Sequence, residues 1–340
     1  MKMVISVKNC AFIGLDDKIA EVYGEEKIAF MKSCGMNTET VLTKEMLETN
    51  PDKAIKTEYL FSTWGMPRFS ETEIERYFPS LKAVFYAAGS VQGFAAEFLN
   101  CGKKVLSAWA ANAVPVAEYT VAQIILANKG FFNSSVIYKQ TKNKELAARN
   151  ALKHTGNYSV NVGIIGAGMI GKMVIERLKP YNINIFVFDP FLSDAKANEL
   201  GVKKGSLSEI FKNCDTISNH LANNPQTVGI IDYSVLSLMK PNAVFINTGR
   251  GAQVVEDDLI RALKEESGRA AVLDVTDPEP PCADSEFYSL PNVVLTPHIA
   301  GSFGNELVRM AEYMLDEYSA LKNGKPNKYE VTLEMLKTMA

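Results

Sequence analysis

The sequence predicts an α/β protein built from two doubly wound domains, and three observations lead to this fold class. From about residue 159 onward, short runs of β-branched residues alternate with stretches whose apolar residues recur every three or four positions. That alternation is typical of parallel strands joined by crossover helices. The first hundred residues show a weaker version of the same pattern, and the length of 340 residues suits roughly two domains.

The second half of the chain accounts for one complete domain. Its predicted strands read VNVGIIG, INIFVFD, TISNHL, AVFINTG, RAAVLDV and VVLTPHI, at 160–166, 183–189, 216–221, 243–249, 269–275 and 293–299. The predicted helices between them cover 169–181, 207–214, 232–240 and 255–267. Six strands with intervening helices describe a doubly wound nucleotide-binding domain.

The N-terminal part predicts a second, smaller α/β unit. Strands are expected at 58–64 and 82–89, and helices at 70–78 and 91–99. A long apolar helix is expected to start near Val114, and a last helix to cover 305–324. If that last helix packs on the N-terminal unit, the chain crosses twice between the units. We therefore expect a discontinuous substrate-binding domain, 1–111 plus 302–340, a nucleotide-binding domain over 112–301, and an inter-domain cleft for the ligand.

Composition and charge exclude several classes of protein. Apolar residues make up 47% and charged residues 22% of the chain, as in ordinary globular proteins. A net charge of -3 without a long basic run gives no footprint for nucleic acid or for an anionic membrane surface. The N-terminal stretch lacks the apolar core of a signal peptide, and no stretch reaches the roughly 18 apolar residues of a membrane span. We expect a cytoplasmic protein.

The cysteines predict neither a disulfide framework nor a metal site. Five are scattered along the chain without a C-x-x-C pair, at Cys10, Cys34, Cys101, Cys214 and Cys282. Reduced structural thiols are the expected state, and no metal is expected.

A glycine motif follows the first strand of the second domain. Gly166, Gly168 and Gly171 form G-x-G-x-x-G, with Met169 and Ile170 opening the helix. The first glycine permits a tight turn, the second lets the backbone approach a pyrophosphate, and the third lets helix and strand pack closely. Asp189 ends the next strand, where a carboxylate can accept hydrogen bonds from ribose hydroxyls and repel a 2′-phosphate. The motif predicts a Rossmann domain that binds NAD; the alternative is a glycine turn without a ligand.

Three other strand ends present a cation, carboxylates and an imidazole. The fourth strand ends at Arg250, the fifth leads to Asp274 and Glu279, and the sixth leads to His298. Arg250 can hold a substrate carboxylate, and His298 can exchange a proton with the adjacent carbonyl oxygen while Glu279 stabilises the imidazolium. This set suits reduction of a 2-keto acid. The alternatives are a packed or surface histidine, a surface arginine and a solvated glutamate.

With these residues in hand, the chain resembles the D-2-hydroxyacid dehydrogenase family. The matching segments lie between Pro115 and Ser302 and read VPVAEYT, GAGMIG, SNHLANNPQT, FINTGRGAQVVEDDLIRAL, LDVTDPEP and TPHIAG. The resemblance implies a catalytic set of Arg250, Glu279 and His298, and a smaller flavodoxin-like substrate domain. It also implies that Asp274 contacts the carboxamide side of the nicotinamide, and that further residues lie along the cofactor: His220, Thr248 and Gly249.

The N-terminal part departs from the family pattern, where many relatives have a glycine-rich loop followed by an Asp-Asn-Ile-Asp run. Here the stretch is YAAGSVQGF, so we expect backbone N–H groups of Gly89, Ser90 and Val91 to hold the substrate carboxylate. Asn112 matches a hinge asparagine found near substrate in some members. Trp64 is expected near the pocket mouth, or alternatively as a cap on the small domain core. The identity of the 2-keto acid stays open.

The resemblance also bears on assembly and regulation. Relatives form two-fold dimers, so a homodimer through the helix from Val114 is expected. About 16 residues follow the last helix, so feedback control through an additional C-terminal domain is not expected. Glu279 stands where related formate dehydrogenases have glutamine, which argues against that reaction. The alternative function is an NAD-responsive binding or corepressor-like protein on the same fold.

Overall fold

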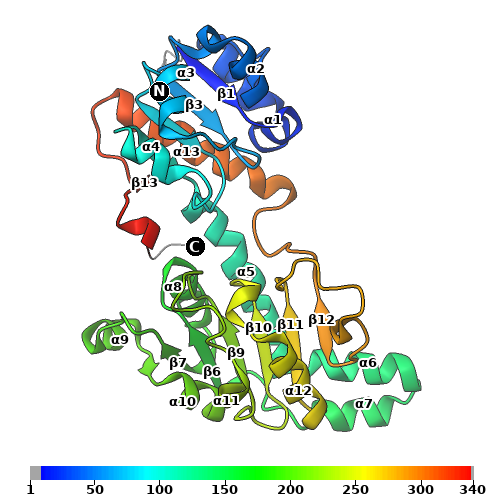
Figure 1. Cartoon of the computed structure of the whole chain (residues 1–340). Helices are drawn as coiled ribbons and strands as arrows, with labels where there is room; N and C mark the ends of the chain where they lie inside the picture. Colours follow the sequence, from blue (N-terminus) through cyan, green and yellow to red (C-terminus); the bar gives the residue numbers. More distant parts are fainter. Residues whose placement is uncertain (1–8, 338–340) are drawn as a thin grey trace. The chain divides into compact units, whose positions relative to one another are not determined.

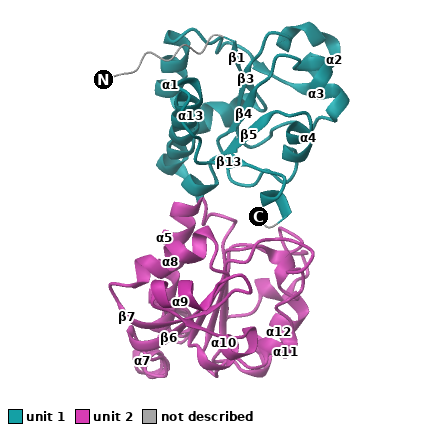
Figure 2. Cartoon of the chain, turned by 90° about the vertical axis from the view of Figure 1, so that its left-hand side faces the viewer, with its two compact units in different colours: residues 1–112, 302–340 teal, residues 113–301 magenta. Residues whose placement is uncertain are grey.

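The computed structural model describes residues 9–337, so most of the N-terminal stretch examined for a signal peptide lies outside the described residues. The chain forms two compact units (Figure 2). Unit 1 comprises Met1–Asn112 and Ser302–Ala340, and unit 2 comprises Ala113–Gly301. Unit 1 is therefore discontinuous along the sequence.

Unit 1 is a sheet covered by helices on both faces. Among the described residues its strand order is β13-β5-β4-β3-β1-β2, and all neighbours pair in parallel except β13 and β5. The five parallel strands follow the flavodoxin-like order 2-1-3-4-5. The strands are β1 (Cys10–Ile13), β2 (Val41–Leu42), β3 (Tyr59–Ser62), β4 (Ala83–Tyr86), β5 (Lys104–Ser107) and β13 (Glu330–Val331). The helices are α1 (Asp16–Ser33), α2 (Lys44–Thr49), α3 (Glu71–Tyr77), α4 (Ala95–Asn100) and α13 (Leu307–Lys322).

Alternate residues of each strand in unit 1 belong to two different core clusters. Phe61 and Phe85 pack in the cluster that contains residues of α1 and α13, which lie side by side (Figures 1 and 2). Leu60 and Val84 pack in the cluster that contains residues of α3 and α4. Because a strand's side chains point to opposite faces in turn, both faces of the sheet are buried and its strands read as continuous apolar runs.

Unit 2 is a parallel sheet of the Rossmann type. Its strand order is β12-β11-β10-β9-β6-β7-β8, which is 3-2-1-4-5-6 with one more parallel strand at the edge. The strands are β6 (Tyr158–Ile165), β7 (Asn182–Phe188), β8 (Lys203–Lys204), β9 (Thr216–Asn219), β10 (Val244–Asn247), β11 (Ala270–Leu273) and β12 (Val293–Leu295). Helix α5 (Trp109–Asn128) begins in unit 1 and belongs to unit 2 from Ala113 onward. The other helices are α6 (Phe131–Thr141), α7 (Lys144–Ala151), α8 (Met169–Leu178), α9 (Asp194–Leu200), α10 (Leu207–Asn213), α11 (Tyr233–Leu236) and α12 (Glu256–Glu265). The predicted fold of two doubly wound domains is confirmed.

The register of this sheet aligns its carboxyl-terminal strand ends. Ile165 of β6 pairs with Asn219 of β9, which pairs with Asn247 of β10, which pairs with Leu273 of β11. The residues that follow these positions therefore leave the sheet along one edge. The switch point of the strand order lies between β6 and β9, and ligands of open α/β sheets bind at such a point.

Several elements differ from the sequence predictions. Helix α5 begins at Trp109 and not near Val114, because the alanines of its first turn strongly favour a helix. Pro115 consequently lies inside the helix and not at its start. The predicted helix over 91–99 begins only at Ala95. Helix α1 was not predicted, because Gly24 (φ 63°) interrupts it and breaks its apolar period. Also missed were β1, β2, β5, β8, β13, α2, α6, α7 and α9.

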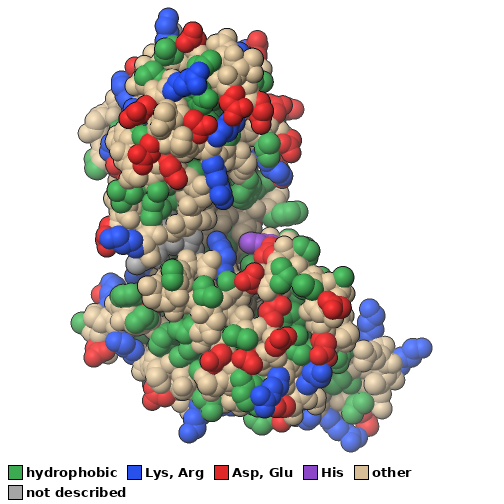
Figure 3. Space-filling model, in the orientation of Figure 1, with side chains coloured by type: hydrophobic (Ala, Val, Ile, Leu, Met, Phe, Trp, Pro, Cys, Tyr) green, Lys and Arg blue, Asp and Glu red, His purple; other side chains and the backbone are tan. Residues whose placement is uncertain are grey.

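Helix α5 has the length and composition of a membrane span, which the sequence analysis did not expect. Its most apolar window has a mean hydropathy of 1.2, and half of that window is buried inside the structure. A core helix of a globular protein meets the same criterion, so this helix is weak support for a membrane location. On the face seen in Figure 3, acidic and basic side chains are interspersed.

Candidate functional site

The glycine turn after β6 is built by close backbone contacts. Gly166 has φ 91°, and a Cβ there would lie 2.8 Å from the backbone oxygen of His220. A Cβ on Gly171 would collide with the backbone oxygen of Gly166. A Cβ on Gly168 would instead point into open space. The first and third glycines are therefore required by packing, whereas the second leaves room beside the turn.

The start of α8 has the donors that a pyrophosphate requires. Gly168 is the N-cap and brings no side chain to accept the first helical N–H groups, which belong to Met169, Ile170 and Gly171. The positive end of the helix dipole and these donors favour a bound anion. The turn therefore fits the diphosphate of a dinucleotide.

Asp189 lies directly beside this turn. Its Oδ2 accepts the backbone N–H of Ala167 at 2.7 Å, and its Oδ1 accepts that of Phe191 at 2.8 Å. The carboxylate is partly exposed, so each oxygen keeps a lone pair for a further donor. This chemistry suits the hydroxyls of a ribose.

His298 and Glu279 form a direct pair. The imidazole Nδ1 lies 2.7 Å from Oε1 of Glu279, and both side chains are about half exposed. His298 adopts φ 56°, a left-handed backbone conformation that is uncommon outside glycine. The pair comes from two different strand ends, the loop after β11 and the loop after β12.

Asp274 holds the backbone around His298. Its Oδ1 accepts the hydroxyl of Thr296 at 2.6 Å and the N–H of Ile299 at 2.8 Å, and its Oδ2 accepts the N–H of Ala300 at 2.9 Å. These bonds lie on both sides of His298 and over-determine its unusual conformation. Asp274 itself is buried, so in this structure it shapes the His298 loop.

Arg250 lies on the loop after β10. Its Nη1 donates to the backbone oxygen of Gly249 at 2.7 Å. Burial lowers the pKa of the Arg250 guanidinium, and the negative charge of Glu279 acts in the opposite direction. The two loops touch, because a Cβ on Gly251 would collide with the carbonyl group of Thr276. Arg250 and Glu279 are thus brought to the same edge of the sheet.

A buried polar chain runs beside the glycine turn. His220 Nε2 lies 2.9 Å from the hydroxyl of Ser218, and His220 Nδ1 lies 3.5 Å from that of Thr248. The hydroxyl of Thr248 lies 3.1 Å from that of Thr120 on α5. Burial lowers the pKa of His220 to about 3, so this imidazole is neutral at physiological pH.

The residues predicted to bind substrate from unit 1 form a local cluster in part. Gly89 lies against the side-chain amide of Asn112, whose Oδ1 accepts the N–H of Ser302 at 2.9 Å. Ser90 is exposed and Val91 is fully buried. Trp64 packs, partly buried, against both core clusters of unit 1, as its alternative interpretation expects. The role of these residues toward a substrate stays a prediction.

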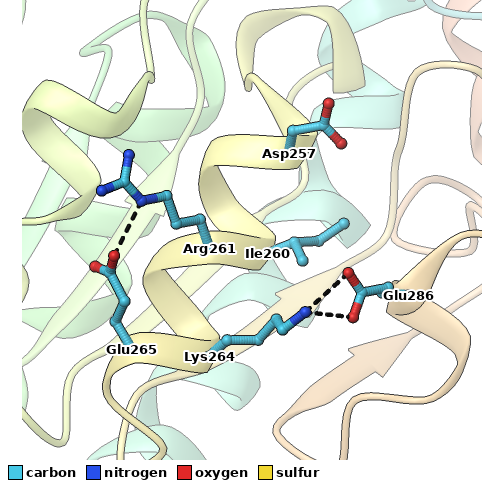
Figure 4. A pocket seen from close by; sticks show the side chains of 6 residues that line it. All are labelled: Asp257, Ile260, Arg261, Lys264, Glu265 and Glu286. Carbon is cyan, nitrogen blue, oxygen red and sulfur yellow. Dashed lines mark hydrogen bonds and ion pairs between the residues drawn. The ribbon is translucent and has the colours of Figure 1, made fainter.

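One pocket of unit 2 lies away from these residues. A pocket of about 410 Å³ borders α12, and its ion pairs join Arg261 to Glu265 and Lys264 to Glu286 (Figure 4). None of the strand-end residues lines it. Among residues 9–337 there is no group of three or more side chains suited to hold a metal ion.

Sequence reasoning missed the side chains that organise these loops. Asn219, Asn247, Gln253 and Tyr119 are hydrogen-bonded at the strand ends. For Asn219 and Asn247, the available signal was a polar residue at the carboxyl-terminal end of a strand. Gln253 lies in a turn and Tyr119 in helix α5, and neither carried such a signal.

Comparison with known proteins identifies the family. The model of the D-isomer specific 2-hydroxyacid dehydrogenase NAD binding domain matches residues 122–300. D-3-phosphoglycerate dehydrogenase of Mycobacterium leprae is 30% identical over 233 residues, 68% of this chain and 43% of that protein. The enzyme of the same name from Archaeoglobus fulgidus is 27% identical over 318 residues, 93% of this chain and 59% of that protein.

Solved structures share the fold. The NAD-complexed D-isomer specific 2-hydroxyacid dehydrogenase of Lactobacillus delbrueckii ssp. bulgaricus superposes with a TM-score of 0.76 at 20% identity, over 95% of this chain and 99% of that chain. The present chain spans about two fifths of the length of the mycobacterial relative. With its NAD-binding domain matched over more than half of its length, the chain belongs to the D-2-hydroxyacid dehydrogenase family.

Proposed function

We propose that this protein transfers a hydride between NAD and C2 of a small 2-keto acid, giving a D-2-hydroxy acid, or the reverse. The observation that carries the proposal is the 2.7 Å contact between His298 and Glu279, at the same sheet edge as the half-buried Arg250. Imidazole, carboxylate and guanidinium are the groups that this reaction needs. Bound NAD supplies or accepts the hydride.

Arg250 would bind the substrate carboxylate. One of its N–H groups donates to Gly249, and a guanidinium has five in a planar fork, so a bidentate contact to a carboxylate is available. Its partial burial strengthens that contact, because charges attract more strongly where water is excluded. The contact would fix C2 in one orientation.

His298 would exchange the proton. With Nδ1 facing Glu279, its Nε2 is the atom that can give a proton to the carbonyl oxygen or take it back. Glu279 would stabilise the imidazolium and hold the ring. Asp274 would keep this ring in place through the backbone bonds on either side of His298.

Further parts of the proposal concern binding and assembly. Unit 1 would supply backbone N–H groups of Gly89, Ser90 and Val91 to the substrate, with Asn112 and Trp64 nearby. A homodimer through α5 to α7 is supported by large apolar side chains exposed on and beside these helices: Leu126, Phe131, Tyr138, Leu146 and Leu152. Protein interfaces often bury large apolar side chains that are exposed on the single chain.

The test is NADH consumption with a panel of 2-keto acids, including glyoxylate, pyruvate, hydroxypyruvate, branched, aromatic and sugar-derived acids. The wild-type protein should turn over one group, and His298→Ala should lose at least about 100-fold in kcat. NADH binding by the variant should stay unchanged. Full activity of His298→Ala would refute the acid-base role, and silence of the wild type despite tight NADH binding would favour the binding-protein alternative.

A further inference from the structure

We infer that Gln253 is a positioning residue that sets the orientation of Arg250 toward the substrate and couples it to the segment after β9. The inference rests on the proposed role of Arg250. Gln253 lies in the short 3-10 turn Gly251–Gln253 after β10 and is fully buried. A buried amide side chain in an apolar sheet edge is costly unless all its hydrogen-bonding groups are paired.

The Gln253 amide uses its full bonding capacity on two different loops. Its Oε1 accepts from Asn219 Nδ2 at 2.6 Å and from the backbone N–H of Arg250 at 3.2 Å. Its Nε2 donates to the backbone oxygens of Leu221 and Ala222 at 2.9 and 3.0 Å. One side chain therefore joins the Arg250 turn to the segment that directly follows His220.

Two asparagines complete the network. Asn219 Nδ2 also donates to Asn247 Oδ1 at 3.0 Å, and that oxygen accepts the N–H of Gly249 at 3.1 Å. Asn247 Nδ2 donates to the backbone oxygen of Arg250 at 3.1 Å. The backbone N–H and C=O of Arg250 are thus both bonded to buried amide side chains, Gln253 on one side and Asn247 on the other.

Gly249 is required by the same network. A Cβ on Gly249 would lie 2.9 Å from both Asn219 Nδ2 and Gln253 Oε1. These distances are shorter than ordinary van der Waals contacts, so any larger residue would displace the amide pair. The hydrogen-bond network therefore requires glycine at position 249 even without a bound cofactor.

Arg250 depends on this backbone for its direction. The guanidinium donates to the oxygen of Gly249, its own neighbour in the turn, so the turn sets where the remaining N–H groups point. Satisfied buried networks rigidify a site, whereas a lost partner leaves unpaired polar groups behind. Without Gln253, the N–H of Arg250 and the oxygen of Leu221 lose their partners, while the oxygen of Ala222 keeps only the hydroxyl of Thr227.

The main test is Gln253→Met, which keeps the length of the side chain and removes its hydrogen bonds. We expect KM for the 2-keto acid to rise at least tenfold, with a smaller change in kcat. We also expect faster backbone hydrogen exchange in peptides that cover 247–254. The matched control is Asn198→Met on the exposed face of α9, which also replaces an amide side chain by methionine and should behave as wild type.

A second variant separates positioning from folding. Gln253→Glu has the same shape and keeps an acceptor for Asn219 and Arg250, but the ionised form has no donor for Leu221 and Ala222. The protonated form regains one donor, so kcat/KM relative to wild type at each pH should recover as the pH falls. If Gln253→Met fails to fold, Gln253→Glu still tests whether Gln253 positions Arg250.

The outcomes are distinguishable from those of the proposed function. Wild-type KM and wild-type exchange in Gln253→Met would overturn the inference, as would a lower melting temperature with unchanged KM. If kcat/KM of Gln253→Glu relative to wild type does not vary with pH, the inference is also contradicted. If the wild-type protein turns over none of the panel, the proposed function fails, and hydrogen exchange at 247–254 alone decides whether Gln253 holds the Arg250 turn.

Discussion

Replacing Gly251 by alanine should separate the two loops that carry Arg250 and Glu279. A Cβ at this position would lie 2.5 Å from the backbone nitrogen of Asp277 and still closer to the carbonyl group of Thr276. Non-bonded carbon contacts need about 3.5 Å, so the loops must move apart by about 1 Å or more. The neighbours are backbone atoms of a loop, which cannot rotate away as a flexible side chain can.

The magnitude follows from that displacement. Overpacking of this kind costs about 1–3 kcal/mol of folding stability. A 1 Å misplacement of a catalytic group costs about 100-fold in rate, so kcat/KM of Gly251→Ala should fall by about that factor. Urea unfolding and steady-state kinetics on the same preparations measure both quantities. Gly205→Ala, where a Cβ would meet only ordinary contacts from 3.5 Å, is the control.

Gly251→Ala could instead keep the kcat/KM and the unfolding midpoint of the wild type. That outcome would contradict the prediction, because it would mean that the two loops move apart at little cost and that their contact does not position Arg250 relative to Glu279. A loss of stability with unchanged kcat/KM would mean that the contact between the loops contributes to folding stability and not to catalysis.

Two further predictions concern the cofactor side of unit 2. Asp189→Ala removes a carboxylate that accepts the N–H groups of Ala167 and Phe191. The affinity for NADH, measured by fluorescence titration, should fall at least about tenfold, and the ratio of NADH affinity to NADPH affinity should become smaller. An unchanged ratio would argue against a contact between Asp189 and the ribose. Burial lowers the pKa of His220 to about 3, whereas an unfolded histidine titrates near about 6.5. Because the unfolded chain then binds the extra proton, His220 should cost up to about 1.4 kcal/mol of stability per pH unit as the pH falls from about 6.5 toward 3. In urea unfolding at about pH 7 and pH 5, His220→Gln should lose less stability on acidification than the wild type, and equal losses would contradict the burial argument.

The strand ends of unit 2 were predictable because their sequences combine two strong local signals. Buried parallel strands read as continuous apolar runs, and glycine-containing turns follow them directly, as at Gly166 and at Gly249. The order of strands and turns then predicted which residues emerge at one edge of the sheet. The observed register, with Asn219 opposite Asn247, agrees with that expectation.

The remaining features depend on tertiary contacts that no local pattern carries. Helix α5 begins five residues before the predicted start, because alanines of moderate hydrophobicity form its first turn. Helix α6 mixes apolar and polar residues without a helical period, and α7 is only eight residues long, so neither gave a clear signal. The role of Gln253 could not be read from its own neighbours in sequence, since its partners include Asn219 and Leu221, more than thirty residues away.

The fate of the hydride shows whether this protein catalyses the proposed reaction. NADH carrying deuterium at the transferred position of C4 is incubated with the protein and the best 2-keto acid of the panel, and the product is analysed by mass spectrometry. We expect a D-2-hydroxy acid with deuterium at C2 from the wild type, and no such product from His298→Ala. Tight binding of NADH without transfer of deuterium to any acid of the panel would contradict this expectation.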